Sequence, residues 1–122
     1  MRGQRLFVRP IDAADASAVA SFLADHAPAQ RAPGIGLVGK LVGELVAVLA
    51  MEMTERAIRV DDLVVAKDLR RKRIGRVMMS ELDVIARKLD REWIEVDRGR
   101  ADEFLERLGF RDDGAKMVRF VK

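Results

Sequence analysis

The chain has 122 residues, of which 49% are hydrophobic and 35% are charged, and its formal net charge is +3. These values predict one globular domain over residues 1–122, and they exclude a disordered chain or a strongly basic protein. The absence of cysteine excludes disulfides, thiolate metal sites and cysteine nucleophiles.

The first half of the chain alternates between β-rich and helical patterns. A strand is predicted over residues 5–11. A helix is predicted over residues 13–25, where apolar residues recur at helical spacing after Asp12, a suitable N-cap. After a loop with two prolines, runs rich in β-branched residues predict three strands in series, at residues 35–41, 44–53 and 57–65.

The second half begins with the clearest helix, because apolar residues from Ile74 to Leu89 recur at spacings of three and four. A strand over residues 93–96 should run parallel to the strand before this helix, since strand–helix–strand units cross over in that way. A helix over residues 101–108 and a terminal hairpin follow. The order β-α-β-β-β-α-β-α-β-β predicts an α/β fold with a mixed sheet and helices on its faces.

The stretch from Val60 to Leu89 combines a strand, a basic loop and a helix N-terminus. Such a junction binds anions, because unpaired backbone N–H groups point outward from the first helical turn. The loop also concentrates cations in a protein of low net charge: Arg70, Arg71, Lys72, Arg73 and Arg76. We therefore expect a site for the diphosphate of a nucleotide-like cofactor.

The element order and three motifs resemble the GNAT superfamily of acyl-CoA-dependent N-acetyltransferases over nearly the whole chain. The signature Gln/Arg-x-x-Gly-x-Gly/Ala corresponds to residues 70–75 (RRKRIG), after Leu63-Val64-Val65. Residues 101–110 are similar to the motif Ala-x-x-Leu-Tyr-Glu-Lys-Leu-Gly-Phe, and residues 43–47 to the usual opening of the third strand. The resemblance implies a three-layer α/β/α domain that transfers acetyl from acetyl-CoA to a primary amine.

The same resemblance implies where the donor binds. Backbone amides from residue 71 to residue 76 would hold the CoA pyrophosphate, and the end of the preceding strand would pair with the pantetheine arm. The implied cofactor-binding residues are Leu63, Val64, Val65, Arg70, Arg71, Lys72, Arg73, Ile74, Gly75 and Arg76.

Three positions depart from the family pattern. Arg73 replaces the first motif glycine; we expect it to keep a right-handed backbone with its side chain turned outward, the alternative being a degraded site with a solvated Arg73. Leu105 stands where the family commonly has the tyrosine that protonates the departing thiolate, and the chain contains no tyrosine. Arg98 stands where an asparagine is usual.

The general base is predicted on the strand before the basic loop. With side chains alternating, Arg59, Asp61, Leu63 and Val65 should share the face toward the cleft. We predict Asp61 as the base, directly or through water, with Asp62 and Glu52 as reserves. The alternative is that the two aspartates only form ion pairs with Arg56 or Arg59.

Other residues suggest weaker assignments. His26 could line the acceptor site or simply end the first helix, where a histidine is favourable. Trp93 is predicted in the core, and Met51 and Met53 in the core or an acyl pocket. No cluster of metal-ligand residues is seen, so we expect no metal. The longest apolar run, from residue 45 to residue 51, is too short to span a bilayer, and no signal-peptide core is present; we expect a cytoplasmic protein without membrane contact.

The leading hypothesis is a small N-acetyltransferase with acetyl-CoA as donor. The alternative is a catalytically weak acyl-CoA-binding regulatory or interaction module of the same fold, which the missing tyrosine favours. A third hypothesis is nucleic-acid binding by residues 70–76. Against it, the positive charge forms only one short cluster, and no aromatic residues are interleaved with it. The acceptor stays open among a protein N-terminus, lysine, an antibiotic, a polyamine and an amino acid, and exposed strand edges allow a homodimer.

Overall fold

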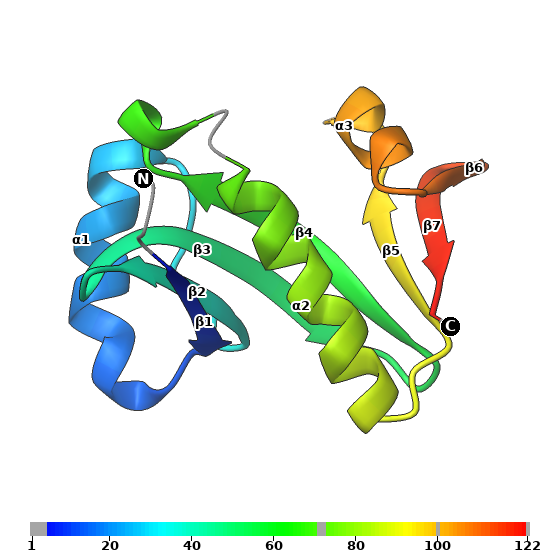
Figure 1. The fold of residues 1–122 in the computed structure, drawn as a ribbon, viewed down its shortest axis with the longest axis horizontal. Coiled ribbons are helices and arrows are strands. Elements are labelled where there is room, and N and C mark those ends of the chain that lie inside the picture. The colour runs from blue at the N-terminus through cyan, green and yellow to red at the C-terminus, as the bar shows by residue number, and fades with distance from the viewer. Residues whose placement is uncertain (1–4, 71–72, 100, 122) are drawn as a thin grey trace.

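The computed structural model describes residues 5–70, 73–99 and 101–121. Within them, seven strands form one mixed sheet in the order β1-β2-β3-β4-β5-β7-β6 (Figure 1). The strands are β1 (Leu6–Pro10), β2 (Gly36–Leu41), β3 (Glu44–Met53), β4 (Ala57–Val65), β5 (Trp93–Asp97), β6 (Arg111–Asp113) and β7 (Lys116–Phe120). The helices are α1 (Ala16–His26), α2 (Ile74–Lys88) and α3 (Asp102–Arg107), with 3₁₀ turns at Ala13–Asp15 and Lys67–Leu69. The predicted element order is confirmed.

The helices α1 and α2 cover opposite faces of the sheet. Gly39 of β2 faces α2 so closely that a Cβ there would lie 2.9 Å from Sδ of Met78. Arg9 of β1 pairs in register with the neighbouring Val38 and therefore points to the other face, where it binds Asp15 at the start of α1. This arrangement gives the three-layer fold that was expected, and it explains why β2 carries a glycine inside a strand.

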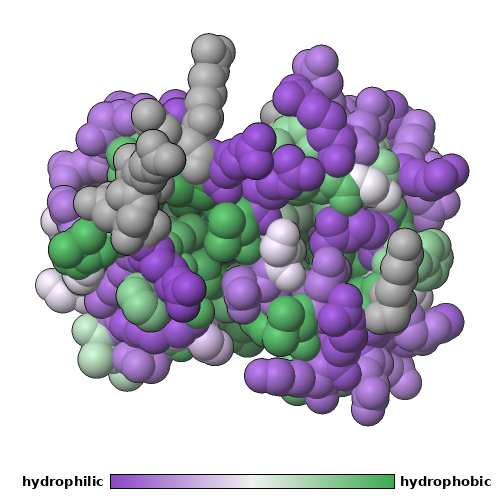
Figure 2. Space-filling model, in the orientation of Figure 1, coloured by the Kyte–Doolittle hydropathy of each residue, from purple (hydrophilic) through white to green (hydrophobic). Residues whose placement is uncertain are grey.

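The core fills both sides of the central strands. Leu37, Leu49, Ile58 and Ile94 are fully buried in the sheet, against Met78, Met79 and Leu82 of α2. Hydrophilic side chains cover most of the face shown in Figure 2, with apolar side chains exposed between them. Among the described residues, no helix is both long and apolar enough to cross a membrane.

The strands β4 and β5 separate partway along their length. They are parallel neighbours, but β4 pairs with β5 only from Ala57 to Val60, opposite Trp93 to Val96. On its other side β4 continues its antiparallel pairing with β3 as far as Val65. Beyond Val60 the two strands diverge, as Figure 1 shows, and the second half of β4 presents an edge that β5 does not cover.

A β-bulge in β4 changes which side chains share a face. Ala50 of β3 pairs with Asp62 and Met51 pairs with Val60, so Asp61 is an extra residue on β4. Asp61 therefore stays on the side of Arg59, at 3.5 Å from its Nε, whereas Leu63 turns to Gly75 of α2. The prediction that Asp61 and Leu63 share one face is wrong, because simple alternation ignores the extra residue.

Candidate active site

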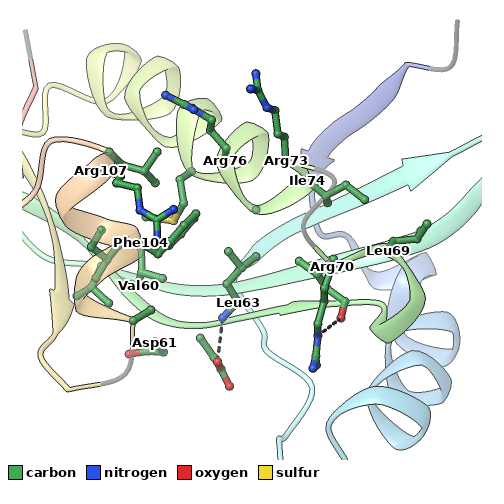
Figure 3. A pocket seen from close by; sticks show the side chains of 18 residues that line it. Val60, Asp61, Leu63, Leu69, Arg70, Arg73, Ile74, Arg76, Phe104 and Arg107 are labelled. Atoms are coloured by element: carbon green, nitrogen blue, oxygen red, sulfur yellow. Dashed lines mark hydrogen bonds between the residues drawn. The ribbon is translucent and has the colours of Figure 1, made fainter. Parts of the chain in front are cut away.

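A cleft of about 990 Å³ opens where β4 leaves β5, between the start of α2 and α3. Figure 3 shows Leu63 and Phe104 directed into it, with Arg76 and Arg107 on the side of the helices. Seven predicted cofactor-binding residues line it: Leu63, Val65, Arg70, Arg73, Ile74, Gly75 and Arg76. Val64 is not among the lining residues and is buried. Arg71 and Lys72 lie outside the described residues.

The edge of β4 facing this cleft carries backbone groups bonded only to nearby side chains. The N–H of Leu63 donates to Oδ1 of Asp62 at 2.9 Å. The carbonyl of Val65 accepts a long hydrogen bond, 3.4 Å, from Nε of Arg70. Both contacts are drawn in Figure 3. An extended ligand with its own amides fits this edge as an additional strand, once the side chains release these groups.

The opposite end of the cleft suits an anion. The first turn of α2 supplies N–H groups without intrahelical partners, at the positive end of the helix dipole. The side chains of Arg70, Arg73, Arg76 and Arg107 line the same space. A pyrophosphate there would meet both backbone donors and charge-assisted hydrogen bonds. The residues present therefore fit a CoA-type ligand.

Arg73, the residue before α2, has a left-handed backbone with φ 64° and ψ 12°. We expected a right-handed conformation, and that expectation is wrong. The position keeps the backbone geometry that favours glycine, although the residue is arginine. Since Arg73 is exposed, its side chain reaches solvent without a steric conflict in the core.

The helix α3 adds cleft residues that the sequence reasoning did not assign. A Cβ built on Gly75 would lie 3.5 Å from Cζ of Phe104, which places the Phe104 ring beside the start of α2. Arg107 supplies a cation one turn further along α3. Both lie in the C-terminal motif at residues 101–110, which is the signal that could have drawn attention to them. Leu105, at the usual tyrosine position, is only 2% exposed and offers no proton.

The three predicted carboxylates meet around the bulge. Nε of Arg59 lies 3.5 Å from Asp61 and 3.9 Å from Glu52, so one arginine neighbours both acids. Hydrogen bonding to Asp61, followed by charge repulsion from it, raises the pKa of the Glu52 carboxyl. Asp62 is different: Oδ1 accepts from Leu63, and Oδ2 is buried without a hydrogen-bond partner among the described residues. The predicted ion pair between Asp61 and Arg59 is present, and Arg56 instead pairs with Glu92.

Arg59 is also tied into a network on the neighbouring strands. It donates to both oxygens of Asp97 at 2.8 Å and to buried Glu95 at 3.3 Å. Burial alone would raise the pKa of Glu95, but hydrogen bonds from Lys116, Trp93 and Arg59 outweigh it and hold that pKa below its usual value. Trp93 is thus half-buried and bonded to Glu95 at 2.9 Å, rather than a core residue.

A second cavity, of about 640 Å³, lies between the loop at residues 29–35 and the strands β3 and β4. Its β3 wall contains Glu52 and Met51, and Met51 is one of the two methionines predicted in the core or an acyl pocket. Asp61 and Asp62 line this cavity and the cleft alike. The bulge therefore stands where the two spaces meet. Within the described part of the chain, no group of three or more His, Asp or Glu side chains is arranged to hold a metal ion.

His26 ends α1, as one of the two sequence readings predicted, and it also makes a contact that neither reading anticipated. It is the last residue of α1, its ring lies 4.7 Å from that of Phe22, and its Nδ1 accepts from the N–H of Lys67 at 3.2 Å. Lys67 opens the connection from β4 to α2. The histidine therefore links α1 to the segment that leads into the anion-binding end of the cleft.

Comparison with known proteins gives a consistent result. A family model described as an acetyltransferase (GNAT) domain matches residues 20–112. A comparison with curated protein sequences finds no match. All the similar solved structures described next share less than 25% of their residues with this chain, so they support the fold alone.

Three of the similar structures are enzymes that carry different names. The ribosomal-protein-S18-alanine N-acetyltransferase from Escherichia coli has 15% identity and a TM-score of 0.76, with 97% of this chain and 95% of that chain covered. An aminoglycoside 6'-N-acetyltransferase complexed with coenzyme A has 14% identity and a TM-score of 0.78, with 95% and 97% covered. N-acetylglutamate synthase from Neisseria gonorrhoeae, complexed with coenzyme A and N-acetyl-glutamate, has 12% identity and a TM-score of 0.82, with 97% of this chain but 35% of that chain covered.

Proposed function

Because the chain belongs to the GNAT family of acetyltransferases, we propose that it transfers an acetyl group from acetyl-CoA to a primary amine. The observation that carries the proposal is the cleft at the uncovered edge of β4, which joins backbone pairing groups to an arginine-lined helix N-terminus. Acetyl-CoA supplies the activated acyl group as a thioester. Similar structures bound to coenzyme A support this choice of donor.

Each part of the cleft has a proposed task. Arg70, Arg73, Arg76 and the first N–H groups of α2 would hold the pyrophosphate, with Arg71 and Lys72 as the remaining cations of the loop. Leu63 and Val65 would pair with the pantetheine amides. In this orientation the acyl group would lie near the bulge, beside the acidic residues.

Asp61 is the proposed general base, with Asp62 and Glu52 as alternatives. It would accept the proton of the acceptor amine, directly or through water, as the nitrogen forms its bond to the acyl carbon. The N–H of Leu63 would stabilise the negative charge on the acyl oxygen, which requires Asp62 to give up its hydrogen bond to that group. The departing sulfur would take its proton from water or from another group than the usual tyrosine, because the chain has no tyrosine and Leu105 stands at that position.

A second candidate function is acyl-CoA binding without turnover. Two observations favour it: Leu105 removes the usual general acid, and Asp62 occupies the N–H that would stabilise the oxyanion. The two candidates share the donor site and differ in the chemistry.

The experiment combines calorimetry with a thiol assay. Acetyl-CoA is titrated into the protein, and CoA release is then measured with a panel of primary amines and a thiol-reactive dye. The protein gives no background in this assay because it lacks cysteine. Binding and amine-dependent release support the proposal, binding alone favours the module, and no binding removes both.

Asp61→Asn tests the proposed base. It should lower turnover roughly 10²–10⁴-fold, the usual contribution of general base catalysis, while leaving the affinity for acetyl-CoA unchanged. Asp68→Asn, in the exposed turn after β4, is the matched control. Equal turnover in Asp61→Asn and wild type would remove Asp61 as the base.

A further inference from the structure

The N–H of Leu63 points away from β3 and toward the cleft. The N–H of Ala66 donates to the carbonyl of Val46, just before the part of β3 that pairs with the end of β4, at 2.9 Å. Successive N–H groups of a strand alternate between its two edges. Leu63 lies three residues before Ala66, so its N–H is directed to the other edge, which β5 leaves uncovered after Val60. This is the group that the proposed function assigns to the acyl oxygen.

Asp62 already occupies this N–H. Its Oδ1 accepts the hydrogen bond from Leu63 at 2.9 Å, and the bond is drawn beside Leu63 in Figure 3. A hydrogen bond to a carboxylate is charge-assisted and roughly twice as strong as one to a neutral acceptor, such as the oxygen of a thioester. The acyl oxygen can therefore bind Leu63 only after a stronger acceptor has left.

The contact of Asp62 with the edge of β4 is reversible. Its other oxygen, Oδ2, is buried and has no hydrogen-bond partner within the described residues, which is a costly state for a carboxylate. By contrast, both oxygens of buried Glu95 accept hydrogen bonds, from Trp93 and from Lys116. Asp62 also lines the second cavity, so its side chain has space to turn away from Leu63 without entering the core.

From this arrangement we propose that Asp62 is a specificity-determining residue of the donor cleft. By capping the N–H of Leu63, it cancels the advantage that the acyl oxygen would give to acetyl-CoA over ligands that lack this oxygen. Binding of the acyl oxygen is then an exchange: the N–H of Leu63 stops donating to Asp62 and donates to the ligand. The inference rests on the proposed function, because it takes the acyl oxygen as the partner of Leu63. Its consequence is that CoA, the product, competes with the donor at similar affinity.

The experiment compares two ligands that differ in one oxygen. They are acetyl-CoA and ethyl-CoA, a thioether with a methylene group in place of the acyl carbonyl. Both ligands carry the same pyrophosphate and pantetheine arm, so a change in the charge of the cleft acts on them alike. The ratio of their Kd values therefore isolates the contact of the acyl oxygen. Each ligand is titrated by calorimetry without an amine, so that no acetyl group is transferred.

In wild type the two ligands should bind within about threefold of each other. In Asp62→Ala the ratio should shift about tenfold in favour of acetyl-CoA, the effect of one hydrogen bond to a charged group. Asp62→Asn is nearly isosteric and keeps a neutral acceptor oxygen, so the shift should be about threefold. This variant keeps the test available if alanine disturbs the bulge.

Asp61→Asn is the matched control. Asp61 precedes Asp62 on β4 and lines the same two spaces, so its substitution removes the same charge at nearly the same place. Because the bond between Asp62 and Leu63 stays intact in this variant, the ratio of the two Kd values should equal that of wild type.

Unchanged ratios in both Asp62 variants, an equal shift in Asp61→Asn, or no binding of either ligand to wild type would overturn the inference. The proposed reaction has its own readout, the amine-dependent release of CoA from acetyl-CoA. A shifted ratio without release would remove the acetyltransferase activity and keep the role of Asp62. Release with unchanged ratios would do the reverse.

Discussion

Arg73 shows how one residue can keep the geometry of a motif while changing its chemistry. Its backbone is left-handed, a conformation that costs an L-residue roughly 1–2 kcal/mol relative to the right-handed one. In return, the residue adds a guanidinium to the anion-binding end of the cleft. Arginine at this position therefore lowers the stability of the fold and adds a positive charge to the cleft.

The variant Arg73→Gly should raise the free energy of unfolding by about 1 kcal/mol, since glycine adopts this conformation without strain. It should also weaken CoA binding, because it removes a cation. Arg76→Gly is the matched control: Arg76 lies inside α2, where glycine should cost about 1 kcal/mol. Urea unfolding of the two variants distinguishes them. Equal destabilisation by both would contradict a left-handed Arg73.

Asp15 is the second residue whose setting predicts a measurable effect. It is buried, it accepts hydrogen bonds of 2.7 and 2.6 Å from Arg9, and it also accepts one from the N–H of Asp12. These hydrogen bonds, Arg9 foremost, hold the pKa of Asp15 well below its usual value. A carboxyl with a lowered pKa stabilises the fold above its unfolded-state pKa, and that stabilisation is lost as the pH falls through the folded-state value.

Asp15→Asn should therefore lower the Tm at pH 7. The difference from wild type should narrow as the pH falls below about 4, the usual range for aspartate. Asp25→Asn, an exposed aspartate on α1, should change the Tm little at either pH. A Tm difference for Asp15→Asn that does not depend on pH would show that the carboxylate charge is not the cause.

At the scale of elements, His26 connects the first helix to the connection between β4 and α2. Its hydrogen bond from Lys67 joins residues 41 positions apart in the sequence. His26→Ala should lower the free energy of unfolding by about 1 kcal/mol, the usual value of one such bond. Asp25→Ala, the exposed neighbour, is the control, and chemical unfolding measures both. No difference between these two variants would show that the bond contributes nothing.

The elements themselves were predictable, because their signals are local. Apolar spacing predicted α2, and runs of β-branched residues predicted β3 and β4 with the bounds that the structure has. The bulge at Asp61 was not predictable, because it depends on the register between two strands. The contact of His26 was not predictable for a related reason: it joins two residues that are far apart in the sequence. The turn of Leu63 away from Asp61 is thus a property of the strand pairing, which no single-strand pattern contains.

At the scale of the whole molecule, the low net charge conceals a local concentration of positive charge. Among the described residues, four arginines line the cleft, whereas Arg31 lines the second cavity together with Glu52. Asp61 and Asp62, at the bulge of β4, line both spaces. The arginines would attract an anionic ligand to the cleft before any specific contact forms.

Arg107→Gln should weaken CoA affinity up to about fivefold at low salt, the effect of one exposed charge. The loss of affinity should be smaller at about 0.5 M NaCl, because salt at this concentration screens interactions between charges more than a few ångströms apart. Arg111→Gln, on the exposed strand β6, has the same charge change outside the cleft and should leave the affinity unchanged. Calorimetry at both salt concentrations measures this. Equal losses in the two variants would indicate a general field rather than a cleft contact.

The separation of β4 from β5 has a consequence for the stability and the lifetime of the protein. Its sheet is incomplete at the uncovered edge of β4, and a bound pantetheine arm would act as the missing strand. A ligand that binds only the folded chain adds about 2.7 kcal/mol of stability at a hundredfold excess over its Kd. The lifetime of this protein would then follow the supply of acyl-CoA: abundant donor would protect the chain from unfolding and proteolysis, and depletion would expose it to both.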